Sequence, residues 1–300
     1  AQINGSGLNI TLDVDVSLRQ IQYLGTAEGA GNGGYIITGN NTITLTGNGR
    51  TNVFMANKGY AKLTFNCNVT FDFHNNGTKE FMLGKNAHTT ANNVIFGEGY
   101  TLKVLDHVEF IFFDETNGET SNQADHRLQL LGTVSSVSGV DGNGANTYVY
   151  KDIYFKDEHY VTIGTNSVWT DHKGDFIIEG ANVTNGVTVN GNVTVRELVM
   201  SGSSDLTINA WGAVTATGST TNAGGEQIVA TTGSGKVIVK TSNNTSGSFI
   251  AKNITDAASD PINMKFERAL DATNSNSATE WTLVSVPVVG ENTDDIEDAL

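Results

Sequence analysis

The stretch Ala61-Lys-Leu-Thr-Phe-Asn-Cys-Asn-Val-Thr-Phe-Asp-Phe73 decides the fold class of this chain. Hydrophobic residues occupy every second position from Leu63 to Phe73, and Thr, Asn or Asp fills each position between them. Because successive side chains of a β-strand point to opposite faces, this alternation predicts a strand with one buried and one solvated face. Similar alternation occurs at 8–16, 42–46, 148–155, 187–190, 193–195 and 236–240. The chain is therefore predicted to be all-β.

The composition of the 300 residues excludes several other classes of protein. Gly, Asn and Thr number 34, 33 and 37, and because all three are poor helix formers, a helical bundle is not expected. The net charge of −15 is opposite to the basic footprint of a nucleic-acid-binding protein. Cys67 is the single cysteine, so a framework of disulfides is excluded. The sequence has no run of about 18 apolar residues, so it predicts no transmembrane segment.

The predicted strands are short and follow one another closely, beginning near 187, 193, 206, 214, 227, 236 and 248. Two architectures have this rhythm: a parallel β-helix, also called a β-solenoid, and tandem antiparallel β-sandwiches. The rhythm continues for over 250 residues, and Asn is abundant enough to stack in side-chain ladders at coil corners. These observations favour the solenoid. We expect coils of about 20 residues, stacked about 4.8 Å apart into a rod of roughly 60 Å.

The character of the sequence changes near residue 256. Asp256-Ala-Ala-Ser-Asp-Pro261 contains the first of two prolines, and a long polar stretch follows at 271–279. We therefore predict a β-solenoid over 1–255. Residues 256–300 are predicted to be a C-terminal cap or the start of a following module, and the chain is expected to be part of a longer protein.

Residues 187–290 contain a series of motifs in a recognisable order. Val-Thr-Val-Asn-Gly-Asn-Val-Thr-Val at 187–195 comes first, followed by Ser-Asp-Leu-Thr-Ile-Asn at 204–209 and Gly-Lys-Val-Ile-Val at 235–239. A strand that contains Arg268 follows, and Trp-Thr-Leu-Val-Ser-Val-Pro-Val-Val-Gly at 281–290 is last. This series resembles a segment of large exported cell-surface proteins of the Bacteroidota.

The resemblance implies a right-handed β-helical passenger that leaves the cell through the type IX secretion system. It implies export across both membranes, an extracellular or cell-surface location and the type IX secretion machinery as a partner. Surface glycans or host surfaces are further expected partners of such an adhesin, stalk or matrix protein. The sorting domain that type IX cargo carries at its C-terminus is not recognisable in this sequence.

An enzymatic alternative rests on Val168-Trp-Thr-Asp-His172, which is similar to the Trp-x-Asp-His element of pectate lyases. Those lyases are also β-helices, and the candidate catalytic residues here are Asp171, His172 and the upstream Asp157. The arginine-and-proline motif of that family is missing. We therefore favour a structural interpretation, in which Trp169 packs in the core and the charged residues are solvated.

Two further sets of candidate residues concern binding. Tyr148, Tyr150 and Tyr154 are separated by even numbers of residues, so on a strand they would lie on the same face. They could form an aromatic platform for a sugar. Asp141-Gly-Asn143 resembles the start of a calcium loop but lacks its third acid and its terminal Glu, so Ca²⁺ is a weak candidate and no other cofactor is expected. No zinc pattern or nucleotide-binding loop occurs.

Three functions remain open from the sequence. The favoured one is a non-enzymatic, secreted or cell-surface β-helical protein. The second is a polysaccharide lyase or glycoside hydrolase built on a β-helix. The third is the subunit of a filament or fibre that grows by stacking the ends of solenoids.

Overall fold

The computed structural model describes most of the strand-rich part of the chain. The described residues are 2–3, 9–23, 34–56, 62–73, 77–83, 93–112, 127–135, 153–156, 160–170, 176–180, 186–195, 198–202, 204–216, 229–233, 235–242, 245–251 and 264–267. They form strands and the turns between them, and none of them is helical. They belong to one compact unit, Ala1–Arg268, whereas the second unit, Ala269–Leu300, lies outside the described residues.

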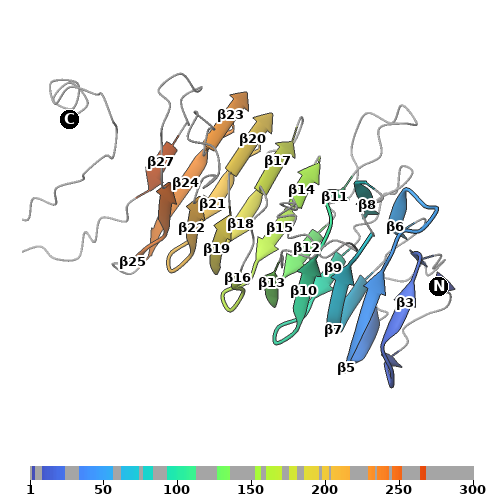
Figure 1. Cartoon of the computed structure of the whole chain (residues 1–300). Coiled ribbons are helices and arrows are strands. Elements are labelled where there is room, and N and C mark those ends of the chain that lie inside the picture. The colour runs from blue at the N-terminus through green and yellow to red at the C-terminus, as the bar shows by residue number, and fades with distance from the viewer. Residues whose placement is uncertain are drawn as a thin grey trace, which may run out of the picture. The chain divides into compact units, whose positions relative to one another are not determined.

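Nine strands form sheet A, and neighbours in the sheet pair in parallel. In order, they are β1 (Gln2–Ile3), β4 (Ile21–Tyr23), β6 (Asn52–Ala56), β8 (Lys79–Met82), β11 (Val108–Ile111), β14 (Ile153–Lys156), β17 (Phe176–Gly180), β20 (Leu198–Gly202) and β23 (Val229–Gly233). Their order in the sheet is their order in the chain, and Figure 1 shows the colours changing steadily along it.

Sheet B has 15 strands. They are β2 (Asn9–Thr11), β3 (Val16–Leu18), β5 (Tyr35–Leu45), β7 (Lys62–Phe71), β9 (Asn93–Phe96), β10 (Thr101–Val104), β12 (Arg127–Leu130), β13 (Thr133–Ser135), β15 (Tyr160–Ile163), β16 (Trp169–Thr170), β18 (Val187–Val189), β21 (Leu206–Ile208), β24 (Val237–Ser242), β25 (Thr245–Ser246) and β27 (Met264–Glu267). Sheet C has three: β19 (Asn192–Val195), β22 (Ala213–Ala216) and β26 (Ser248–Ala251).

The long strand β7 shows how sheet B divides. The first half of β7 pairs with β9 and its second half with β10, both in parallel. Beyond β7 the sheet therefore continues as two rows, one through β9, β12, β15, β18, β21, β24 and β27, the other through β10, β13 and β16. A parallel bridge from Val168 to Asn192 connects the second row to sheet C. From β9 to β23, the chain visits the first row, then the second row or sheet C, then sheet A, and repeats this circuit.

The core is formed by the alternate residues that each strand turns inward. Strand β7 shows the pattern throughout, since Leu63, Phe65, Cys67, Val69 and Phe71 are buried and the residues between them are partly exposed. The alternation predicted over 61–73 is confirmed there. Because the ladders are in register, each inward residue stacks on its counterpart one circuit away.

An aromatic ladder runs through sheet A at one register position. It contains Phe54 of β6, Phe81 of β8, Phe110 of β11 and Phe155 of β14. The rings of Phe54 and Phe81 are stacked, with centroids 4.3 Å apart, and those of Phe81 and Phe110 are 5.2 Å apart. Each such pair contributes about 0.5–1.5 kcal/mol beyond the burial of its surface. Stacked aromatics therefore stabilise the parallel register of this sheet.

The structure establishes an all-β fold with parallel sheets, an arrangement compatible with a β-solenoid. Among the described strands the pairings are parallel except for the hairpin of β24 and β25, so tandem antiparallel sandwiches do not describe them. Strand β27 lies within the predicted cap of 256–300 and still continues the ladder of β24. The predicted boundary at residue 255 itself stays a prediction.

Two expectations from the sequence are corrected. Val187 pairs with Leu206, a separation of 206 − 187 = 19 residues, but Val94 pairs with Leu128, a separation of 128 − 94 = 34. The expected repeat of about 20 residues is therefore wrong for most circuits, because the connections between strands vary in length while the paired strands keep their register. The run at 8–16 is not one strand, since it bends at 12–15 between β2 and β3.

Asparagine and glycine occupy corners as predicted in two places. Asn190 lies at the corner after β18, and Asn209 lies at the corresponding corner after β21. Asn209 Nδ2 donates a hydrogen bond of 2.8 Å to Asn190 Oδ1. This contact is one step of the predicted side-chain ladder. Asn48-Gly49 forms a turn, and Gly49 has a φ of +67°, which favours glycine.

Candidate functional site

Most of the candidate residues singled out in the sequence lie outside the described residues. These are Asp141 and Asn143 of the calcium-like loop, Tyr148 and Tyr150 of the aromatic platform, and Asp157, Asp171 and His172 of the lyase-like set. Tyr154 lies in β14, where its backbone is in register with Glu109 and Ile177. The catalytic, sugar-binding and metal-binding roles of these residues stay predictions.

Trp169, the first residue of the lyase-like element, belongs to the core. Its side chain is 2% exposed, and its ring lies against that of Phe176, with centroids 5.3 Å apart. The structural interpretation of this tryptophan is confirmed. The resemblance of Trp169-Thr-Asp-His172 to a lyase element therefore includes a residue that cannot contact a polymer on the surface.

No group of three or more His, Cys, Asp or Glu side chains suited to a metal ion occurs among the residues that the structure describes. In the same residues, no helix has the length and apolar character needed to cross a bilayer.

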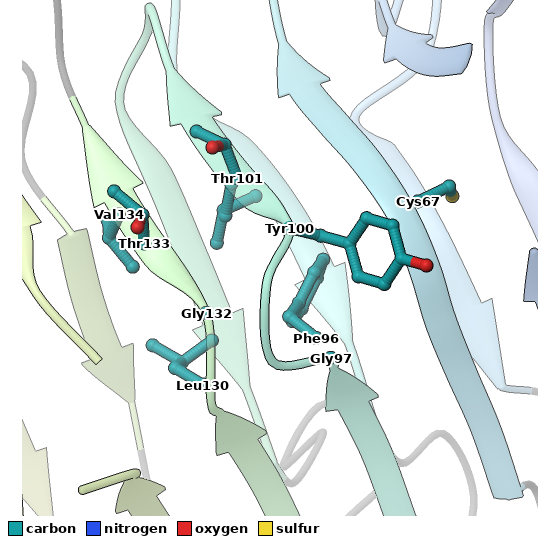
Figure 2. A pocket seen from close by; sticks show the side chains of 10 residues that line it. Cys67, Phe96, Gly97, Tyr100, Thr101, Leu130, Gly132, Thr133 and Val134 are labelled. Carbon is teal, nitrogen blue, oxygen red and sulfur yellow. The ribbon is translucent and has the colours of Figure 1, made fainter. Parts of the chain in front are cut away.

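A small hollow lies between strands β7, β9, β10, β12 and β13, beside Cys67 and Tyr100 (Figure 2). Its volume of about 10 Å³ is at the lower limit for a single water molecule. Burial raises the pKa of the Cys67 thiol to about 11. Because the thiolate is the reactive form, this cysteine is inert at neutral pH. The small volume of the hollow is that of a packing defect.

The described surface has one feature that stands out chemically, a set of exposed large hydrophobic side chains. There are four: Val14, Val168, Trp211 and Ile250. Val168 pairs with Asn192 at the start of β19, Trp211 lies in the turn before β22, and Ile250 lies in β26. Three of the four therefore lie on or beside sheet C.

We define the sheet C face as the outward residues of this region: Val168, Asn192, Thr194, Trp211, Ala213, Thr215, Ser248 and Ile250. Asn192 is in register with Ala213 and Ser248, and Thr194 is in register with Thr215 and Ile250. The inward residues Val193, Val195, Val214 and Ala216 are buried. The outward residues of the three strands thus form two columns of uncharged side chains, which are small except for Ile250.

Trp211 is held in an unusual backbone conformation. It is the third residue of the turn Asn209-Ala-Trp-Gly212, which is closed by a hydrogen bond of 2.9 Å from Gly212 N to Asn209 O. Its φ is +72°, the single positive φ of a non-glycine residue in the described chain, and its side chain is 74% exposed. A bulky residue in this region of φ is strained. The corresponding turn between β9 and β10 has Gly99 at this place, with a φ of +82°.

Sequence reasoning did not single out Trp211. One feature of the sequence points to it: Trp211 stands next to Gly212, in a turn between two alternating segments. An aromatic side chain in such a turn is not expected to be buried. Alternation alone does not reveal it, because exposure at a turn depends on how the neighbouring circuits are stacked. The densest aromatic stretch of the sequence, 148–160, is the stronger pattern.

Comparisons with protein-family models, with curated proteins and with solved structures gave no match to this chain. The function is therefore argued from the residues and the surface described above.

Proposed function

We propose that the chain is a right-handed parallel β-solenoid that acts outside the cell as a non-enzymatic surface protein. Its role is that of an adhesin, a stalk or a matrix component. In this proposal it is cargo of the type IX secretion system, and the segment from 256 onward is a cap or the start of a following module.

The observation that carries the proposal is the continuity of the parallel ladders. Sheet A keeps a register through Ile21, Phe54, Phe81, Phe110 and Phe155, and the chain returns to it after each visit to the other sheets. Such repetition supports a fold whose stability comes from contacts between neighbouring repeats. A long supporting structure is what a stalk or surface display requires.

Three properties of the chain support an extracellular role without catalysis. The net charge of −15 and the Thr and Asn on outward strand positions favour a solvated surface. The order of motifs over 187–290 resembles exported Bacteroidota surface proteins. The described residues contribute an uncharged, partly apolar face, which suits recognition better than acid–base chemistry.

The location is tested on cells that produce the protein. Antibody labelling of intact cells and digestion of the surface with a protease are expected to detect it outside, and loss of the type IX translocon is expected to retain it inside. Equal retention in both strains contradicts type IX export, and protection from protease on intact cells contradicts the surface role.

The enzymatic alternative is tested by incubating the protein with pectin, alginate and neutral polysaccharides, with and without Ca²⁺. We expect no new reducing ends or unsaturated products. Product formation that Asp171→Ala abolishes would overturn the non-enzymatic proposal. Negative-stain images of the isolated protein test the filament alternative. Regular fibres in these images would support it.

A further inference from the structure

We propose that the sheet C face binds a neutral polysaccharide chain, with Trp211 stacking on a sugar ring. Asn192, Thr194, Thr215 and Ser248 are assigned to hydrogen bonds with its hydroxyl groups. This binding site gives a ligand class to the proposed extracellular role. It concerns the surface of this chain alone, so its test does not depend on the route of export.

The first argument is the strain at Trp211. Holding a bulky residue at a φ of +72° costs on the order of 1–3 kcal/mol. Glycine adopts this φ without a steric penalty, as Gly99 does in the corresponding turn. The indole makes no compensating contribution to the core, because 74% of it is exposed. A strained residue whose side chain projects into solvent is explained by a contact with something outside the chain.

The second argument is the chemistry around the indole. Strands β19, β22 and β26 have the sequences Asn-Val-Thr-Val, Ala-Val-Thr-Ala and Ser-Phe-Ile-Ala, and none of these residues is charged. The whole chain has a net charge of −15, so the face differs from the average surface. An anionic polymer or a basic protein would find no counter-charge on these strands. A neutral ligand requires none.

The third argument distinguishes a polysaccharide from a protein partner. The exposed apolar residues Val168, Trp211 and Ile250 are interspersed with amide and hydroxyl side chains instead of forming one apolar core, whereas the centre of a stable protein interface is depleted in polar side chains. Sugar rings present both apolar faces and hydroxyl groups. Aromatic side chains with a few fixed polar groups are the usual lining of sites for such mixed ligands.

The size of the face indicates an extended ligand. Paired strands lie about 4.8 Å apart, so the row from β16 through β19 and β22 to β26 extends over roughly 14 Å. A single sugar cannot contact Trp211 and the columns on all three strands of sheet C. The geometry therefore favours a chain of several sugar units over a free monosaccharide.

Affinity electrophoresis tests the proposal directly, with the full chain in native gels cast with soluble polysaccharides. The neutral probes are xyloglucan, mixed-linkage β-glucan and galactomannan, and the anionic probes are alginate and polygalacturonate. We expect at least one neutral probe to retard the protein. Titration with oligosaccharides of that probe is expected to change the tryptophan fluorescence, because the exposed Trp211 is one of 3 tryptophans.

Trp211→Gly is the deciding variant, because glycine fits the backbone and only the indole is lost. We expect affinity to fall by about tenfold or more, as for an aromatic anchor, while the unfolding midpoint stays the same or rises. Thr194→Ala combined with Thr215→Ala is expected to weaken binding as well. Val14→Ser is the matched control, since it removes an exposed hydrophobic side chain outside this face.

Several outcomes overturn the proposal. In the first, none of the neutral probes retards the protein. In the second, only the anionic probes retard it. In the third, a neutral probe retards the wild type and Trp211→Gly equally. Self-association that Trp211→Gly abolishes, without carbohydrate binding, would instead make a second copy of the chain the occupant of the face. None of these outcomes bears on whether the protein reaches the cell surface.

Discussion

Trp211 stands at the same place in its turn as Gly99 in the turn between β9 and β10, and both residues have a positive φ, of 72° and 82°. The two turns start alike, since the first residue of each donates a backbone hydrogen bond to the preceding circuit. Gly97 N donates to Phe65 O, and Asn209 N donates to Val189 O. The backbone of the turn is thus shared, while one turn carries a glycine and the other a large exposed indole. The first prediction follows from this difference.

Trp211→Gly is expected to stabilise the chain by about 1 kcal/mol, because it relieves the strain of a positive φ at a side chain that contributes little burial. The measurement is the midpoint of urea unfolding. Asn166→Gly is the control, since Asn166 occupies the third place of the turn 164–167 without a positive φ. An equal rise in both variants would show that the strain at Trp211 is not the cause.

Gly132→Ala is expected to destabilise the chain by about 1–3 kcal/mol, the usual range for overpacking. A Cβ at this position would lie 2.2 Å from Tyr100 O and 2.6 Å from Gly97 O, both of them backbone atoms of the preceding circuit. Gly77→Ala is the comparison, because a Cβ there meets nothing within 4 Å and only its positive φ is unfavourable. If the unfolding midpoints of the two variants coincide, the close approach at Gly132 is unimportant.

Phe81→Ala is expected to cost about 3–5 kcal/mol, the range for removing a buried aromatic side chain. Phe81 is fully buried and lies between Phe54 and Phe110 in the ladder of sheet A. Phe249→Ala is the control, since Phe249 is only partly buried against the core. Chemical denaturation of the three proteins measures the effect, and a loss at Phe81 no larger than at Phe249 would contradict the role of the ladder.

Alkaline pH is expected to destabilise the fold. Burial raises the pKa of Cys67 from 9.0 to about 11, and burial together with the neighbouring Tyr35 raises the pKa of Tyr23 from 10.0 to about 12. The unfolded chain therefore loses these protons at a lower pH than the folded chain. The stability they contribute is complete below pH 9 and is lost as the pH rises from 9 to 12.

Urea midpoints measured across this range check the alkaline effect. Cys67→Ala is expected to reduce the decline between pH 9 and 11 and to leave the decline from Tyr23 in place. A wild-type midpoint that is constant from pH 8 to 11 would show that neither group is buried as described.

The strand at 62–71 was predictable because its alternation is long and unbroken, and its inward residues are the ones that are buried. The run at 8–16 has the same period but bends between β2 and β3. Val14, expected to face inward, is 64% exposed, and Asp15 Oδ1 instead accepts a hydrogen bond of 2.7 Å from Thr42 N. Alternation does not report such a bend, because it depends on a partner 27 residues away.

From the sequence alone it follows that this protein is built of strands, which residues of 62–71 face the core, and that glycine and asparagine turn the chain at corners such as Asn48-Gly49. These properties depend on the two-residue period of a strand and on local backbone preferences. Parallel pairing, the length of each circuit and the exposure of Trp211 became visible only in the folded chain. The physical reason is that pairing and exposure depend on contacts between circuits, and the paired residues are separated in the chain by 206 − 187 = 19 to 155 − 110 = 45 residues, a distance that no local pattern encodes.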